Sequence, residues 1–129
     1  MDRKIIASAA LIGAFAIVLG AFGAHGLKAV LDENQLATFE TGVKYQMYHA
    51  LFLLFIGTTA LLSEKGKLLI FRLIILGVLF FSGSIYLLST ASLTGIATKF
   101  IGPITPIGGL FLIAGWVVLF AKILGKKAE

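Results

Sequence analysis

Hydrophobic positions along this chain form long uncharged runs rather than an alternating pattern. After the charged residues Asp2, Arg3 and Lys4, no charged residue occurs over residues 5–24. At about 1.5 Å per residue, a helix of this length spans about 30 Å, the thickness of a bilayer's hydrocarbon core. Three further runs carry no charge or a single cation near one end: 45–63, 68–91 and 106–124. The pattern predicts an all-α membrane protein with four transmembrane helices in a bundle, as a single domain over residues 1–129.

A polar segment separates the first two runs. Asp32 and Gln35 have the spacing of a capping box, and Leu31 and Leu36 are placed to form the hydrophobic staple around it. Apolar residues then recur at intervals of three and four, which is typical of a helix with one apolar stripe. We therefore expect a short amphipathic helix over about 33–44, in the first outer loop and at the membrane surface.

Composition supports the membrane assignment. The chain is 59% hydrophobic and 13% charged, whereas about a quarter of the residues of a soluble domain are charged. It has no cysteine, which excludes disulfides, thiolate-held metals and covalently attached haem. The net charge of +5 comes from cations that flank the apolar runs. This pattern favours membrane lipids as partners and argues against nucleic acid.

The distribution of the cations predicts the topology. With four spans, both chain ends and the second loop share one side of the membrane. Eight of the eleven cations fall on that side, and the other side has Lys28, Lys44 and Lys99. The eight are Arg3, Lys4, Lys65, Lys67, Arg72, Lys122, Lys126 and Lys127. By the positive-inside rule, both termini are expected in the cytoplasm.

Small residues line one face of the first predicted span. They recur at intervals of three and four residues, which places them in line along the helix: Ala9, Gly13, Ala16, Gly20 and Ala24. Small side chains allow helices to approach closely in lipid. The face is expected to pack inside one subunit, and a subunit interface is the alternative.

The two histidines are the main candidate ligands for a metal or a haem. His25 ends the first span and His49 opens the second, so packed helices roughly 8–10 Å apart would bring them together at the outer face. The leading interpretation is structural, with each ring bonded to a carbonyl, a tyrosine or Glu40. The alternatives are a divalent metal held by His25, His49 and Glu40, or a haem with two axial histidines.

Two further stretches combine small and polar residues. Ser82-Gly83-Ser84 with Tyr86 is expected to mark a close helix crossing, with a polar permeation path as the alternative. In GPITPIGG (102–109), Thr105 is the predicted N-cap of the last span and Pro106 its first helical residue. Gly108 and Gly109 would then admit a neighbouring backbone.

Four blocks together resemble the bacterial family called domain of unknown function 423. They are GAFGAHGL, FETGVKYQMYHALFLL, FSGSIYLL and GPITPIGGLFLIAGW, in the family's order and over most of the chain. The family comprises small four-span inner-membrane proteins, related to eukaryotic transmembrane protein 256, without an established activity. The resemblance implies a bacterial inner-membrane location and a recurring set of residues. As a candidate functional or structural cluster we take Gly23, His25, Gly26, Gln46, His49, Ser82, Ser84, Tyr86, Pro103, Pro106, Gly108 and Gly109.

Absent motifs limit the function. There is no recognisable nucleophile with a base and an acid, no phosphate-binding glycine loop, and no acidic or basic residue in the middle of a predicted span. We expect a non-catalytic structural or accessory membrane component without a cofactor, acting alone, as a homo-oligomer or in a larger membrane complex. The alternatives are a small carrier or channel for a neutral or weakly polar solute, and the metal or haem protein described above.

Overall fold

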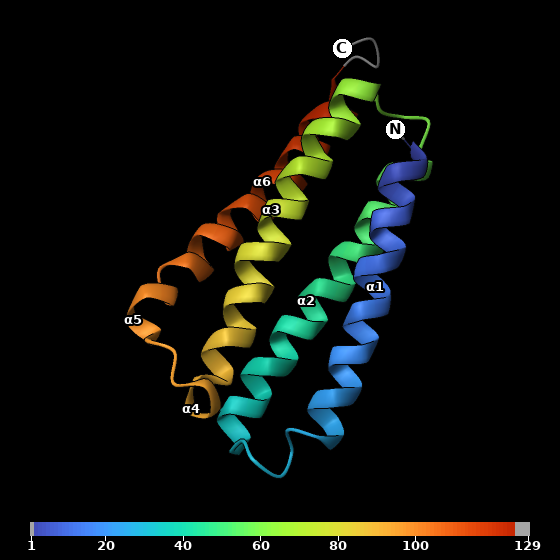
Figure 1. Cartoon of the computed structure of the whole chain (residues 1–129). Coiled ribbons are helices and arrows are strands. Elements are labelled where there is room, and N and C mark those ends of the chain that lie inside the picture. The colour runs from blue at the N-terminus through green and yellow to red at the C-terminus, as the bar shows by residue number, and fades with distance from the viewer. Residues whose placement is uncertain (1, 126–129) are drawn as a thin grey trace.

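The computed structural model describes residues 2–125, and this part of the chain is helical without strands. Figure 1 shows four long helices and two short ones. In chain order they are α1 (Asp2–His25), α2 (Glu33–Thr58), α3 (Glu64–Ser89), α4 (Ala91–Thr94), α5 (Thr98–Ile101) and α6 (Ile104–Leu124). The long helices correspond to the four apolar runs of the sequence.

The four long helices form an open layer, a detail of their packing that the predicted bundle did not specify. Packing follows chain order, α1 on α2, α2 on α3 and α3 on α6, and α1 and α6 lie at opposite edges (Figure 1). Among the described residues, α1 and α6 form no comparable packed pair. A bundle closes in water to hide its core. In lipid, both faces of a layer can stay covered by acyl chains, so closure gains little.

Helix α2 differs most from the sequence-based expectation. It begins at Glu33 as predicted, because the capping box forms: Gln35 N donates to Asp32 Oδ1 at 2.8 Å and Asp32 N donates to Gln35 Oε1 at 3.0 Å. It then continues unbroken to Thr58, so the expected amphipathic helix (33–44) and second span (45–63) are one helix. Gly42 does not interrupt it.

The boundaries of the last two long helices also shift. Ser63, placed in the second span by the sequence, instead caps α3, and its Oγ accepts from Gly66 N at 3.1 Å. Helix α6 begins at Ile104 with Pro103 as its N-cap residue. Thr105, the predicted cap, therefore lies inside the first turn. Pro106 lies there too, and its missing N–H breaks no hydrogen bond, because the N–H groups of the first turn have no acceptor within the helix.

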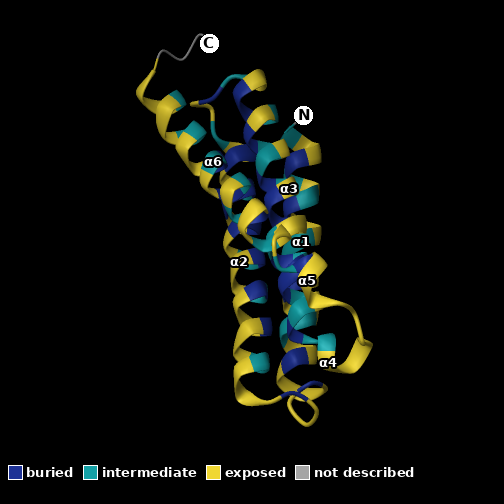
Figure 2. Cartoon of the chain, turned by 90° about the vertical axis from the view of Figure 1, so that its left-hand side faces the viewer, coloured by how far each residue is buried: buried dark blue, intermediate teal, exposed yellow. Residues whose placement is uncertain are grey.

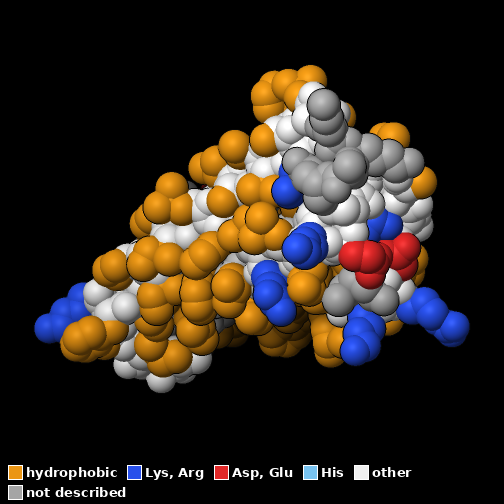
Figure 3. Space-filling model, turned by 90° about the horizontal axis from the view of Figure 1, so that it is seen from above, with side chains coloured by type: hydrophobic (Ala, Val, Ile, Leu, Met, Phe, Trp, Pro, Cys, Tyr) orange, Lys and Arg blue, Asp and Glu red, His pale blue; other side chains and the backbone are white. Residues whose placement is uncertain are grey.

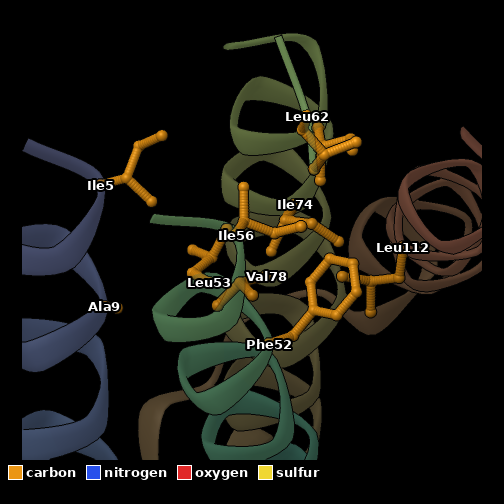
Figure 4. Close-up of a cluster of buried hydrophobic side chains, with 10 residues drawn as sticks. Ile5, Ala9, Phe52, Leu53, Ile56, Leu62, Ile74, Val78 and Leu112 are labelled. Carbon is orange, nitrogen blue, oxygen red and sulfur yellow. The ribbon is translucent and has the colours of Figure 1, made fainter. Parts of the chain in front are cut away.

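The main core lies between the four long helices toward the end that carries the N-terminus. Figure 4 shows Ile5 and Ala9 of α1 near side chains of α2 and α3, with Leu112 entering from α6. The outer surface is largely apolar, and exposed positions run the full length of the helices (Figure 2).

Three helical segments are long and apolar enough to cross a membrane: Asp2–His25, Glu64–Ser89 and Thr98–Leu124. Helix α2 is not among them, because Lys44, Gln46 and His49 lower its mean hydropathy. The first residues of α1 and the turn between α2 and α3 lie at one end of the layer, and α4 lies at the other (Figure 1). Seen from the first end, lysine and arginine side chains lie around a small acidic patch (Figure 3).

Candidate functional site

The predicted cluster is distributed along the layer rather than gathered at one site. One group joins α1, α2 and α3, a second joins α3 to α6, a third lies where α1 ends, and His49 stands apart from all three. The groups are described in that order.

Gln46 is the centre of the first group, and its side chain is only 6% exposed. Its Nε2 donates to the Ile12 carbonyl of α1 at 2.9 Å. Its Oε1 accepts from the Tyr86 hydroxyl of α3. One amide thus bonds both neighbours of α2. Beside it, Ser82 Oγ donates to the Gly42 carbonyl at 2.7 Å, a second buried link between α2 and α3.

The second group joins α3 to α6 by backbone proximity. Gly108 lies against the backbone of Phe80 and Phe81, so closely that a Cβ has no room there. A Cβ at Gly109 would meet only the Phe81 ring, at 3.7 Å. Ser84 and Thr105 share a hydrogen bond between their hydroxyls. The predicted close approach at the two glycines is therefore tight at Gly108 and loose at Gly109.

The third group is the turn after α1. Gly23 is buried, and a Cβ there would lie 3.0 Å from the ring of Phe39. Gly26 N donates to the Phe22 carbonyl at 2.7 Å as the chain leaves the helix. His25 is exposed at the helix end. These residues shape the turn and support the small core of Leu27, Leu31 and Phe39 beneath it.

His49 is buried in the middle of α2, and both of its ring nitrogens have partners. Nδ1 lies 2.7 Å from the Tyr45 carbonyl, which can only accept, so Nδ1 carries a proton. Nε2 accepts from the indole N–H of Trp116 on α6 at 3.0 Å. The two contacts together select the neutral ring protonated at Nδ1, since a second proton at Nε2 would face the donor of Trp116.

The structure does not bring His25 and His49 together. His49 neighbours Ala50, whose Cβ lies opposite Gly13, so the two histidines are separated by twelve residues of α1, or about 18 Å along the axis. Glu40 is exposed and makes no ion pair within the described residues. The expected joint site of His25, His49 and Glu40 is therefore not assembled, because continuous α2 carries His49 away from the loop.

The small-residue face of α1 packs on α2 within the same chain. Ala9 and Ala16 are buried, a Cβ at Gly13 would lie 3.6 Å from that of Ala50, and one at Gly20 would lie 3.4 Å from Val43. Ala24, at the end of the series, is exposed.

Three of the clefts on the structure border residues of the candidate cluster. The first, about 320 Å³, is lined by Tyr45, His49 and Trp116 among others. The second, about 330 Å³, and the third, about 470 Å³, share Leu79, Gly83 and Tyr86. The second and third clefts reach the polar stretch on α3. The hydroxyls there already form hydrogen bonds, Ser82 with the Gly42 carbonyl and Ser84 with Thr105.

Sequence reasoning missed three residues that hold α6 in place. Trp116 was not singled out, although a lone tryptophan inside an apolar span needs a partner for its N–H. Gly77 and Gly115 were also missed, and a Cβ at either would approach Leu112 or Ile74 to 2.5 Å. Gly108 and Gly115 are seven residues apart, which is two helical turns, so they lie on the same face of the helix. That spacing in the sequence could have indicated the face of α6 that packs closely on a neighbour.

Comparison with known proteins gives a consistent result. The family described as a protein of unknown function (DUF423) matches residues 19–109. The UPF0382 membrane protein SH2409 of Staphylococcus haemolyticus is 41% identical, covering 91% of this chain and 92% of its own. A UPF0382 membrane protein of Haemophilus influenzae is 39% identical, covering 92% of each chain, and YwdK of Bacillus subtilis is 38% identical, covering 91% and 93%. No solved structure matches the chain. The chain therefore belongs to the DUF423 family of membrane proteins of unknown function.

Proposed function

We propose that this protein is a four-span protein of the bacterial inner membrane, with both termini in the cytoplasm, and that it acts without catalysis as a structural or accessory component. The 26 residues of α2 extend about 39 Å, long enough to cross beside its neighbours. Its charged residues, Glu33, Glu40 and Lys44, are exposed and lie in its first half. Its uncharged polar groups Gln46 and His49 are buried against α1, α3 and α6. Shielding by neighbours removes the main cost of placing them in a membrane.

Cysteine labelling tests the topology, because the native chain has no cysteine. Lys65→Cys and Lys99→Cys place exposed thiols at opposite ends of the layer. In intact spheroplasts, a membrane-impermeant maleimide should label Cys only in the Lys99 variant. Both variants should react after permeabilisation, which is the control. The reverse labelling pattern, or labelling of both variants in intact spheroplasts, would contradict the proposed orientation.

A non-catalytic role rests mainly on one observation: among the described residues, every buried side-chain nitrogen and oxygen has a hydrogen-bond partner. Residues that carry out chemistry usually keep a donor or acceptor free for a substrate, whereas here the polar groups fasten helix to helix. The lipid-facing surface then remains as the part of the protein able to engage other molecules.

Gentle solubilisation of native membranes tests the accessory role. The protein should elute from size exclusion above the mass of its monomer-detergent complex, alone as an oligomer or with a second protein. A matched sample solubilised in a harsh detergent supplies the monomer reference. Elution as a bare monomer from native membranes, with no copurifying protein, would overturn the proposal.

A further inference from the structure

The cleft of about 330 Å³ lies between α1 and α3, with α2 as its floor. Phe15 and Leu19 form one wall, Leu79 and Gly83 form the other, and Gln46 lies at the base. We call it the α1–α3 groove. Its walls are apolar, and Gln46 is already bonded to Ile12 and Tyr86, so the groove offers an occupant mainly hydrocarbon contact.

Two cations stand in line with the walls of this groove. Arg72 precedes Leu79 by seven residues and Lys4 precedes Phe15 by eleven, which are two and three helical turns. Arg72 therefore lies on the same face of α3 as Leu79, and Lys4 on the same face of α1 as Phe15. Both side chains are exposed.

The two cations also lie at similar depth. Lys67 Nζ contacts Asp2 Oδ1 at 3.1 Å, which sets the register of α1 against α3 at this end. Lys4 is two residues beyond Asp2 and Arg72 five beyond Lys67, a difference of about 4.5 Å along the axis. Lys67 engages Asp2, and within the described residues neither Lys4 nor Arg72 forms an ion pair.

We propose that the α1–α3 groove seats an anionic phospholipid of the bilayer, with its phosphate between Lys4 and Arg72 and an acyl chain extending to Gly83. The distance fits: the eleven residues from Arg72 to Gly83 rise about 16 Å, close to the thickness of one hydrocarbon leaflet. The long arginine and lysine side chains extend toward the headgroup from the two helix faces that carry the walls of the groove. Each cation near a headgroup strengthens binding of anionic lipid, and zwitterionic lipid gains less.

Native mass spectrometry of the delipidated full-length protein tests this site, with phosphatidylglycerol and phosphatidylcholine as probes. The parent should retain phosphatidylglycerol about tenfold better than phosphatidylcholine. The double variant Lys4→Gln, Arg72→Gln should lose this preference. Lys99→Gln, which removes an exposed cation at the opposite end, is the matched control and should keep it.

Gly83 allows a second test within the groove itself. A Cβ at Gly83 meets no atom within 4 Å, so Gly83→Leu should fill the groove without disturbing the helices. It should lower phosphatidylglycerol retention about tenfold although both cations remain. Ala10→Leu, on an exposed face of α1 that points away from the groove, should have no effect.

Equal retention of the two lipids by the parent would overturn the proposal. So would a loss of preference in Lys99→Gln as large as in the double variant, since binding would then follow total charge rather than this groove. Unchanged phosphatidylglycerol retention in Gly83→Leu would equally exclude an acyl chain in the groove. Thermal melting of each variant confirms that the helices are intact before lipid is added.

Discussion

The contact between α3 and α6 and the contact between α2 and α3 hold neighbouring helices together by different means. Between α3 and α6, glycines carry most of the contact, beside one hydrogen bond between two hydroxyls: Gly108 lies on the Phe81 backbone, and Gly115 lies against Ile74. Between α2 and α3, side-chain hydrogen bonds carry it, from Tyr86 to Gln46 and from Ser82 to the Gly42 carbonyl. Gly42 also lies against Tyr86, so the second contact uses close approach as well.

The difference follows from what each helix must do. In lipid, apolar surface alone gives helices little reason to associate, so close packing and hydrogen bonds have to replace it. Helix α6 lies at an edge and packs mainly on α3. Its glycines lack side chains, so the two helices can approach closely enough for that one contact. Helix α2 lies between α1 and α3, and Gln46 bonds to both. The polar residues of α2 thus connect it by hydrogen bonds to the helices on both of its sides.

Gly108→Leu should give the largest effect, because its Cβ would occupy the space of the Phe81 backbone. Backbone cannot move aside as a flexible side chain can, so α6 must separate from α3. We expect a loss of about 3 kcal/mol or more in the free energy of unfolding, or no folded protein. Thermal melting in detergent, followed by circular dichroism, measures it.

Gly83→Leu is the matched control for this prediction, since it makes the same substitution in a helix where a Cβ meets nothing within 4 Å. It should melt at or slightly above the temperature of the parent, because leucine favours a helix more than glycine does. Equal destabilisation by both substitutions would mean that the α3–α6 contact is not limited by backbone proximity.

The sequence was sufficient to locate α1 closely, the other long helices approximately, and one cap. An uncharged run long enough to cross a bilayer is a local property, so residues 5–24 predict α1 (Asp2–His25) closely. The capping box at Asp32 and Gln35 is equally local, and it forms. The small residues on α1 indicated which face packs, and the structure shows that this face lies on α2.

The arrangement of the candidate site could not be predicted in the same way. Placing His49 beside His25 required α2 to start near Tyr45, but the capping box starts the helix three turns earlier. The partner of His49 is Trp116, sixty-seven residues away, and periodicity identifies a buried face without naming what covers it. Nor does periodicity separate an open layer from a closed bundle, because both bury one stripe of each helix.

Gly13→Leu should have the next largest effect. A Cβ at Gly13 would sit 3.6 Å from that of Ala50, which is ordinary contact, whereas the rest of a leucine side chain would push α1 from α2. We expect a loss of about 1–3 kcal/mol for leucine and little change for Gly13→Ala. Chemical unfolding in mixed micelles compares the two. An alanine variant as unstable as the leucine variant would show that the conformational freedom of glycine, rather than space, matters at this position.

The hydrogen bonds around Gln46 should contribute less than the glycine contacts. Gln46→Leu removes the partners of both Tyr86 and the Ile12 carbonyl, and Tyr86→Phe removes one donor. Interhelical hydrogen bonds in membranes average about 0.6 kcal/mol and reach about 1.7. A double-mutant cycle should therefore give a coupling of about 1 kcal/mol, with the double variant less destabilised than the sum of the singles. Strict additivity would show that the bond between the two side chains adds no stability.

Trp116→Phe should have the smallest effect and tests whether a hydrogen bond from α6 to α2 adds stability. Phenylalanine keeps an aromatic ring near Phe52, whose ring centroid lies 4.1 Å from that of Trp116, and removes the N–H that donates to His49 together with one ring of the indole. We expect a loss of about 0.5–1 kcal/mol in the free energy of unfolding. Trp116→Leu, which removes both the ring and the donor, is the control and should cost more. The ¹⁵N chemical shifts of His49 give a separate readout, because Nε2 should change environment in Trp116→Phe while Nδ1 stays protonated against the Tyr45 carbonyl. Unchanged shifts at both nitrogens would mean that Trp116 does not donate to His49, and that α6 is held by its glycine contacts and the Ser84–Thr105 hydrogen bond to α3.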